Sequence, residues 1–239
     1  MTAQRHMRTI GILGGMGPEA TILLQSRLLN AVDAQDDVDH LPLLVSMNPQ
    51  VPSRLDWILE NKGINPGPVL AQMALSLQQG GADALAMPCN TAHHFAPEIE
   101  QATEIPFFNM PQLAAKTVAE VVGEEEGSIG VLASPSNQVT GLFDQTLGLH
   151  GYRAVFPVNQ AIMLEAIRAI KANGLKDSTI RTLQHESDKL VSKGVKCILI
   201  ACSEFSLLTE SIHAKVPLID TLDVLVDHLV TFSGARKKG

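Results

Sequence analysis

ALAMPCNTA at residues 84–92 and LIACSEF at residues 199–205 are the two stretches that decide the fold. Each is a short apolar run of strand length that ends at a cysteine, Cys89 in the first and Cys202 in the second. Buried strands of a parallel sheet are short, continuous apolar runs of this kind. Two copies of one pattern in a single chain predict two related halves.

Two further landmarks occur once in each half, in the same order around the cysteine. GILGGMG at residues 11–17 and GVLASPS at residues 130–136 are apolar runs that pass into loops of small residues. After the cysteine, each half has an apolar run that contains a proline, IPFFNM at residues 105–110 and VPLIDT at residues 216–221. The repeat predicts two similar lobes related by an approximate two-fold axis, with the two cysteines facing each other across a cleft.

The arrangement of apolar runs along the chain predicts an α/β fold. Short runs alternate with longer segments of helical period, which is the pattern of βαβ units in a parallel sheet. We expect one lobe to comprise residues 1–112 and 209–239 and to carry Cys89, and the other to comprise residues 113–208 and to carry Cys202. Strands are expected at residues 8–13, 41–47, 82–87, 105–110, 128–133, 152–156, 196–201 and 216–220.

Bulk composition limits the classes of partner. The chain has 239 residues, of which 45% are hydrophobic, and a formal net charge of −7. A negative chain is not attracted to nucleic acid or to anionic lipid, so neither is an expected partner. No apolar stretch approaches the roughly 20 residues that span a bilayer, and the first ten residues lack the apolar core of a signal peptide. We therefore expect a cytoplasmic protein.

The three cysteines call for different explanations. A sparse, odd set in a chain of this size predicts reduced thiols rather than disulfides. Cys197 lies at the beginning of an apolar run, where packing in the core explains it. Cys89 and Cys202 lie at equivalent strand ends of the repeat, and ligands of α/β proteins bind at the carboxyl ends of strands. These two thiols are therefore the candidate catalytic residues.

Two opposed thiols are suited to inverting a stereocentre, because one group must remove a proton from one face while another delivers a proton to the opposite face. Each cysteine precedes a predicted helix, whose first N–H groups would lower the thiol pKa. Asn90, Thr91 and Ser203 follow the cysteines directly. These side chains can bind a carboxylate and an ammonium group, or cap the same helices.

Two other readings of the motifs are weaker. Residues 15–20 fit the dinucleotide pattern G-x-G-x-x-A, but Glu19 would put a negative charge in the first helical turn, where a pyrophosphate should lie. Cys89, His93 and His94 could form a metal or Cys–His site, but adjacent histidines on a helix point in different directions and no further ligand cluster is visible. His93 is expected behind Cys89, and neither a metal nor another cofactor is expected.

The sequence resembles the aspartate/glutamate racemase family over nearly its whole length. The resemblance rests on GILGGMGPEAT at residues 11–21, MNPQVPSR at residues 47–54, MPCNTAH at residues 87–93, IKANG at residues 170–174 and ACSEF at residues 201–205. It implies two Rossmann-like lobes with parallel sheets and the active site in the cleft between them. It also implies catalysis without pyridoxal phosphate or a metal, and a homodimer.

The resemblance implies roles for particular residues. Arg54 and Lys171 would hold substrate carboxylates, Asn90 and Thr91 would bind the α-amino-acid head group, and Met16 would line the floor of the pocket. Other residues near the cysteines and in the loop after the second lobe's first strand complete the expected site, with Ser134, Ser136, Asn137 and Ser203 as substrate-binding residues and His93 and Glu204 behind the catalytic ones.

The sequence departs from the family pattern in two places. Residues 201–204 read Ala-Cys-Ser-Glu where the family usually has Gly-Cys-Thr-Glu, and residues 134–137 replace a threonine-rich turn. Serine keeps the hydroxyl, but the altered loop could change which substrate side chain is accepted.

These features predict racemisation of an acidic amino acid, with aspartate ahead of glutamate and a broader range left open. The alternatives are hydantoin racemisation, maleate isomerisation or arylmalonate decarboxylation on the same fold, and a non-catalytic amino-acid-binding protein.

Overall fold

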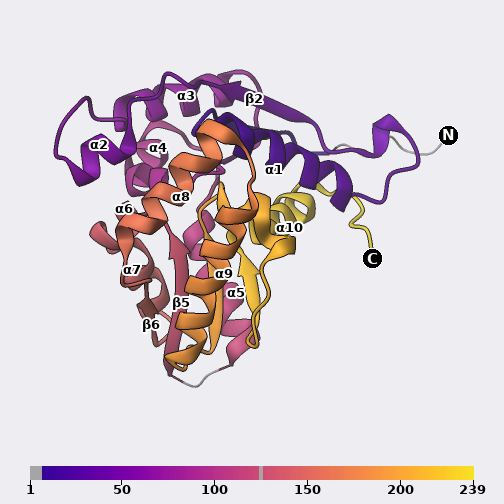
Figure 1. The fold of residues 1–239 in the computed structure, drawn as a ribbon. Helices are drawn as coiled ribbons and strands as arrows, with labels where there is room; N and C mark the ends of the chain where they lie inside the picture. The colour runs from indigo at the N-terminus through magenta and orange to yellow at the C-terminus, as the bar shows by residue number, and fades with distance from the viewer. Residues whose placement is uncertain (1–6, 124–125) are drawn as a thin grey trace.

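The computed structural model describes residues 7–123 and 126–239, which form two lobes joined side by side (Figure 1). Each lobe is built on a four-stranded sheet in which all neighbouring strands are parallel. The first sheet has the order β2-β1-β3-β4 and the second the order β6-β5-β7-β8. The strands are β1 (Ile10–Gly14), β2 (Leu43–Met47), β3 (Ala84–Ala86), β4 (Phe107–Phe108), β5 (Gly127–Ala133), β6 (Tyr152–Val155), β7 (Cys197–Ala201) and β8 (Leu218–Asp220).

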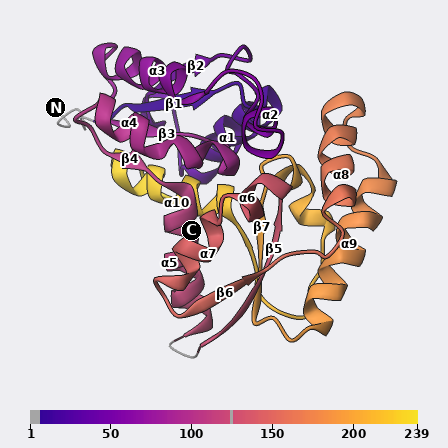
Figure 2. The same cartoon turned by 90° about the vertical axis from the view of Figure 1, so that its left-hand side faces the viewer.

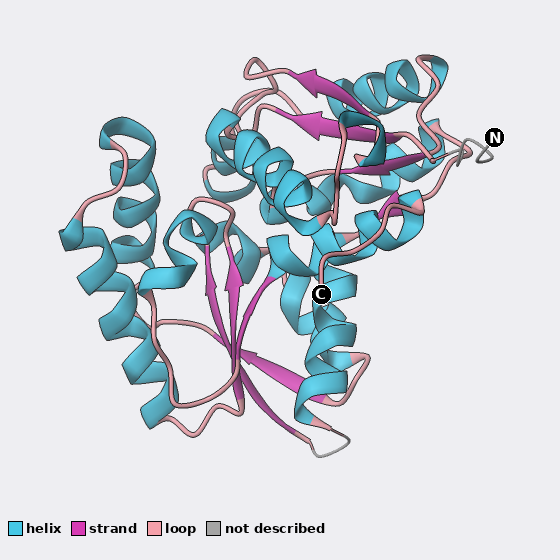
Figure 3. Cartoon of the chain, turned by 90° about the vertical axis from the view of Figure 1, so that its right-hand side faces the viewer, coloured by secondary structure: helices cyan, strands magenta, loops and turns pink. Residues whose placement is uncertain are grey.

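The internal repeat predicted from the sequence is confirmed by this topology. Corresponding strands take corresponding places in the two sheets, so β1 matches β5 and β3 matches β7. Every predicted strand is present. The five residues of β1 and the five of β7 are all buried, which explains why these segments read as continuous apolar runs. In Figure 3 the strand arrows of the second lobe point toward the first lobe.

Helices cover both faces of each sheet, as the parallel strands require. The first sheet packs against α3 and α4 on one face and against α1 and α10 on the other. The second packs against α8 and α9 on one face and against α5 and α7 on the other (Figure 2). The helices are α1 (Pro18–Ala31), α2 (Arg54–Leu59), α3 (Gly67–Gln79), α4 (Ala96–Ala102), α5 (Met110–Val122), α6 (Pro135–Val139), α7 (Leu142–Gly148), α8 (Gln160–Asn173), α9 (Asp177–Ser192) and α10 (Thr221–Ser233), with short 3-10 helices η1 (Asp37–Asp39), η2 (Asn90–Phe95) and η3 (Phe205–Ser211).

Helices α5 and α10 cross between the lobes. Helix α5 follows the last strand of the first sheet, yet Ala114, Ala115 and Val118 on this helix join the core of the second lobe. Helix α10 follows β8 of the second sheet and packs in the core of the first lobe. The expected division placed residues 209–239 in the first lobe. Helix α10 of this range does lie there, but β8, which belongs to the same range, pairs with β7 in the second sheet. The exact lobe boundaries stay a prediction.

The loop between β1 and α1 is held against the loop after β2. Gly15 has a φ of 95°, and a Cβ at this position would collide with the backbone of Asn48. Its N–H donates to Thr21 Oγ1 at 2.9 Å, which fixes the turn at the beginning of α1. Only glycine fits both the dihedral angle and the close approach. The turn leaves the side chain of Met16 next to residues that follow β2.

No helix within residues 7–123 and 126–239 is long and apolar enough to cross a bilayer. The first six residues, which belong to the segment that lacks the apolar core of a signal peptide, lie outside the described range.

Candidate active site

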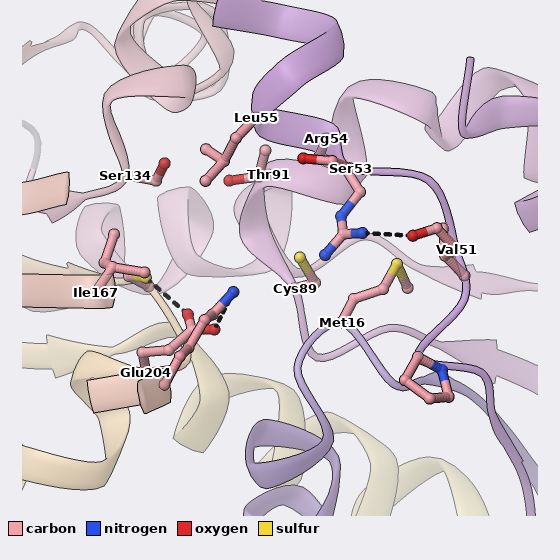
Figure 4. Close-up of a pocket in the computed structure, with 13 residues that line it drawn as sticks. Met16, Val51, Ser53, Arg54, Leu55, Cys89, Thr91, Ser134, Ile167 and Glu204 are labelled. Carbon is pink, nitrogen blue, oxygen red and sulfur yellow. Dashed lines mark hydrogen bonds and ion pairs between the residues drawn. The ribbon is translucent and has the colours of Figure 1, made fainter. Parts of the chain in front are cut away.

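A cavity of about 280 Å³ contains both candidate thiols, and residues of both lobes line it. Cys89 follows β3, and Cys202 follows β7 directly, so each comes from the carboxyl end of the matching strand. The full lining is Met16, Pro49, Val51, Ser53, Arg54, Leu55, Cys89, Thr91, Ser134, Ile167, Lys171, Cys202 and Glu204. Figure 4 shows Cys89, Met16 and Arg54 on one side of this cavity and Ile167 and Glu204 on the other.

Cys202 is protonated and bound to a carboxylate. Its side chain is almost fully buried, with 6% exposed, and its Sγ donates to Glu204 Oε2 at 3.0 Å. Burial raises the pKa of Cys202 well above its usual value, and the negative charge of Glu204 raises it further. The sequence-based expectation that a helix start would lower this pKa is wrong. The segment after Cys202 is a short 3-10 helix that begins only at Phe205, and the carboxylate lies closer to the thiol.

Lys171 approaches the same carboxylate from helix α8. Its Nζ lies 3.0 Å from Glu204 Oε1, with 40% of the lysine side chain exposed. Burial alone would lower the pKa of Lys171, but the charge and the hydrogen bond of Glu204 outweigh burial, and the pKa is raised. Lys171 is therefore a cation in the cavity. Glu204 links this cation to the thiol of Cys202.

Arg54 supplies a second cation from the other lobe. It is the first residue of α2, and Ser53 caps that helix by accepting a hydrogen bond from the N–H of Asp56 at 3.2 Å. The Arg54 Nη1 donates to the carbonyl oxygens of Val51 at 3.1 Å and Pro52 at 2.9 Å. Its Nε is buried without a hydrogen-bond partner. Within the described part of the chain, Arg54 has no carboxylate partner, so its charge is available to an anion.

His93 lies behind Cys89 and contacts its backbone. The ring is 2% exposed and stacks on Phe107 with 5.3 Å between ring centroids. Its Nε2 accepts a hydrogen bond from the N–H of Met110 at 3.1 Å, so the proton of the neutral ring is on Nδ1, which donates to the Cys89 carbonyl oxygen at 2.9 Å. Burial lowers the pKa of His93 to about 4. The ring is therefore neutral near pH 7 and holds the backbone of Cys89.

Four residues expected to bind substrate lie outside the cavity lining. Ser203 Oγ donates to the Pro88 carbonyl oxygen at 2.8 Å. Asn90 Nδ2 donates to Thr221 Oγ1 at 3.0 Å. Ser136 Oγ lies 2.8 Å from Ser134 Oγ and 3.1 Å from Thr91 Oγ1, and Asn137 Nδ2 donates to the Ala201 carbonyl oxygen at 3.5 Å. Their roles as substrate ligands stay predictions.

Thr91, Ser134 and Met16 do line the cavity, together with five residues that the sequence analysis did not select. These five are Pro49, Val51, Ser53, Leu55 and Ile167. Four of them flank or belong to the segment that ends at Arg54, and Ile167 lies one helical turn before Lys171 on α8. The i, i+4 spacing on α8 was therefore a usable signal for Ile167.

Within residues 7–123 and 126–239, no group of three or more His, Cys, Asp or Glu side chains is placed to hold a metal ion.

The structure thus combines a two-lobed α/β fold with a cavity between the lobes that is lined by two thiols and two cationic side chains, an arrangement typical of a small-molecule site. Comparison with known proteins identifies the family. The chain belongs to the Asp/Glu/hydantoin racemase family, whose model matches residues 13–229. It is therefore an isomerase of the racemase type.

Individual relatives agree with this assignment. The chain is 24% identical over 227 residues to the broad specificity amino-acid racemase RacX of Bacillus subtilis, covering 93% of this chain and 96% of the relative. Aspartate racemase of Picrophilus torridus superposes with a TM-score of 0.80 at 26% identity, covering 97% of this chain and 96% of that one. An aspartate racemase homologue from Pyrococcus horikoshii has a TM-score of 0.73 at 18% identity, covering 95% and 100%, and supports the fold alone.

Proposed function

We propose that this protein is a cofactor-independent amino-acid racemase that moves the α-proton of its substrate between Cys89 and Cys202. The observation that carries the proposal is that both thiols line one cavity and come from matching strand ends of two similar lobes. A substrate held in the cavity would present opposite faces of its α-carbon to the two sulfurs.

The reaction needs one thiolate and one thiol. The thiolate takes the α-proton, which breaks the Cα–H bond, forms an S–H bond and leaves the electron pair on carbon. The opposite thiol then gives its proton to the other face, and this sulfur becomes the thiolate. The two sulfurs have exchanged protonation states, so the enzyme is ready for the opposite enantiomer. No pyridoxal phosphate or metal is required in this scheme.

The contacts of Cys202 support a definite starting state. Its raised pKa and its hydrogen bond to Glu204 keep the proton on this sulfur in the free enzyme. We propose that Cys202 is then the acid and Cys89 the base for one enantiomer, with the roles reversed for the other. Glu204 stabilises the protonated form and orients the S–H bond.

The charges of the cavity support an anionic substrate. Arg54 and Lys171 are positive, and Glu204 is negative and bound to Lys171. Because Glu204 already pairs with Lys171 while Arg54 contacts only backbone carbonyl oxygens, the charge of Arg54 favours a substrate that carries a carboxylate. We propose that Arg54 binds one carboxylate and Lys171 the other, which would hold the α-carbon between the sulfurs. Aspartate is our first candidate because the cavity is small, at about 280 Å³.

Polar groups near Cys89 support recognition of the amino-acid head group. The hydroxyls of Thr91 and Ser134 face the cavity from opposite lobes. The Oδ1 atoms of Asn90 and Asn137 are buried without hydrogen-bond partners. A buried carbonyl oxygen without a donor is costly, so an ammonium group that reached either oxygen would stabilise the complex. We also propose a homodimer in the cytoplasm, as the family resemblance and the sequence imply.

A substrate panel tests the proposal. The enzyme is incubated with reductant and without added cofactor, separately with D- and L-aspartate, glutamate and uncharged amino acids, and the enantiomers are separated by chiral chromatography. We expect inversion of aspartate or glutamate in both directions. Inversion of a hydantoin, isomerisation of maleate or decarboxylation of an arylmalonate in place of amino-acid racemisation would overturn the substrate assignment, and binding of aspartate without any turnover would overturn catalysis.

A further inference from the structure

The residue that follows each cysteine takes part in hydrogen bonds that connect the two lobes. Ser203 follows Cys202, and its Oγ donates to the carbonyl oxygen of Pro88, the residue before Cys89, at 2.8 Å. Asn90 follows Cys89, and its Nδ2 donates to Thr221 Oγ1 at 3.0 Å. Thr221 is the first residue of α10 and follows β8 of the second sheet directly, so this second link also leads from a residue beside one thiol toward the sheet that carries the other.

The second link continues to the strand that carries Cys202. Thr221 Oγ1 donates to the carbonyl oxygen of Ile200 in β7 at 3.1 Å, two residues before Cys202. The backbone segments that carry the two thiols are therefore joined twice, once through Ser203 and once through Asn90 and Thr221. We call Ser203, Asn90 and Thr221, with their acceptors Pro88 and Ile200, the interlobe clamp.

The interlobe clamp is buried. Ser203 is 3% exposed, Asn90 2% and Thr221 0%. Breaking a buried hydrogen bond leaves an acceptor that water cannot reach, so these links persist in the resting protein. A serine hydroxyl has one proton, and that of Ser203 is given to Pro88. Ser203 therefore has no proton left to donate to a substrate carboxylate, and its side chain does not line the cavity.

We propose that the interlobe clamp fixes the spacing of Cys89 and Cys202, and that Ser203 and Thr221 are positioning residues. This inference rests on the proposed two-thiol racemisation. Both sulfurs must lie within about 3–3.5 Å of the same carbon, one on each face, for a carbanion formed by one thiolate to be protonated by the other thiol. A small separation of the lobes would move one sulfur away and leave the other in place.

Ser203→Ala and Thr221→Val test the clamp by removing each hydroxyl. We expect kcat to fall about tenfold to a hundredfold, as for a catalytic group displaced by about 1 Å, with KM changed by less than about twofold. In D2O, deuterium should appear in recovered substrate several-fold faster relative to inversion. The carbanion waits longer for the displaced thiol, so the S–H formed by abstraction has time to exchange with D2O, and the carbanion then takes a deuteron back from that same sulfur. Ser203→Thr keeps the hydroxyl and should restore both values.

Ser233→Ala is the matched control. Ser233 is 1% exposed, and its Oγ donates to the Val230 carbonyl oxygen at 2.8 Å, away from the cavity. It should leave kcat, KM and the exchange ratio unchanged. Thermal melting checks that each variant is folded, and Thr221→Val carries the test if Ser203→Ala does not fold. A rise in KM with unchanged kcat in Ser203→Ala would make Ser203 a head-group ligand and overturn the clamp.

Cross-linking gives a readout that does not need turnover. Dibromobimane joins two nearby thiols when each sulfur displaces one bromide, and mass spectrometry identifies the joined peptides. We expect a Cys89–Cys202 cross-link in the wild type and less of it in Ser203→Ala, with single alkylation retained. If the wild type racemises nothing but this difference appears, the clamp stands and the proposed function fails. If the wild type racemises and Ser203→Ala matches Ser233→Ala in both assays, the clamp is overturned.

Discussion

Replacing Glu204 by glutamine should slow one of the two proton transfers. The change keeps the shape of the side chain but removes the charge that accepts the S–H bond of Cys202 at 3.0 Å and pairs with Lys171 at 3.0 Å. A hydrogen bond to a charged group contributes about 1.5–3 kcal/mol and a neutral one about 0.5–1.5 kcal/mol. Because only 12% of the Glu204 side chain is exposed, solvent screens the difference little. A loss of about 1–2 kcal/mol corresponds to a roughly 5- to 30-fold fall in kcat/KM.

The pH dependence of Glu204→Gln has a definite sign. Burial is the main cause of the raised pKa of Cys202, and the negative charge of Glu204 raises this pKa further. Removing that charge lowers the pKa of Cys202, although burial still holds it above the usual value. Activity requires one thiol to stay protonated, so the pH above which kcat/KM declines should move downward in the variant. Glu210→Gln, which makes the same change at an exposed residue on η3, should leave the profile unchanged.

Isotope effects identify which transfer is slowed. The two enantiomers have the same free energy in water, so kcat/KM must fall equally in both directions. With α-deuterated substrates, the isotope effect should rise for the enantiomer whose deuteron goes to Cys202 and fall toward one for the other. Unchanged rates and unchanged isotope effects in Glu204→Gln would refute the role of this carboxylate.

Three further variants test other parts of the account. Lys171→Met should lower kcat/KM for aspartate about tenfold and should affect kcat/KM for alanine much less. The expected loss is near the lower limit for a charged hydrogen bond because 40% of the lysine side chain is exposed. An equal loss for both substrates would argue against a contact between Lys171 and the side-chain carboxylate. Cys197→Ala should keep activity and cost about 1 kcal/mol in urea unfolding, since the thiol is fully buried in the core and burial raises its pKa to about 12. His93 has a pKa of about 4 when folded against about 6.5 when unfolded, so the unfolded chain binds more protons between these values. The contribution of His93 to the free energy of unfolding is therefore fully present above about pH 6.5 and should fall by about 3 kcal/mol as the pH drops to about 4. Urea unfolding of His93→Gln should not show this loss. The same pH dependence in the variant would contradict the assignment.

Much of the fold was predictable because its signals are local. Buried parallel strands are apolar along their whole length, and the repeated order of landmarks led to two similar lobes before any contact was known. The exchange of α5 and α10 between the lobes agrees with the expected division of the chain, but helical periodicity alone does not determine it. Their apolar faces have the same helical period whichever lobe they cover, and only the three-dimensional packing decides between the two partners.

The candidate site was predictable to a similar depth. Strand-end position identified Cys89 and Cys202, and the family motifs added Arg54 and Lys171, all of which line the cavity. The hydrogen bond of Ser203 to the opposite lobe could not be predicted, because a hydroxyl beside a cysteine suits a substrate or a backbone acceptor equally well.

The direction of the Cys202 pKa shift depends on a partner two residues away. A helix start after the cysteine was the local expectation, but the sequence does not say that the Glu204 side chain turns back toward the sulfur. Short-range contacts of this kind depend on side-chain rotamers, which the surrounding lobe selects.

The most direct test of two-thiol racemisation is proton NMR of D- and L-aspartate, then of other amino acids, in D2O with the wild type, Cys89→Ala, Cys202→Ala and Cys197→Ala, without added cofactor. The account predicts loss of the α-proton signal with formation of the opposite enantiomer by the wild type and by Cys197→Ala, and no inversion by either of the other two variants. Inversion at the wild-type rate by Cys89→Ala or Cys202→Ala would contradict it.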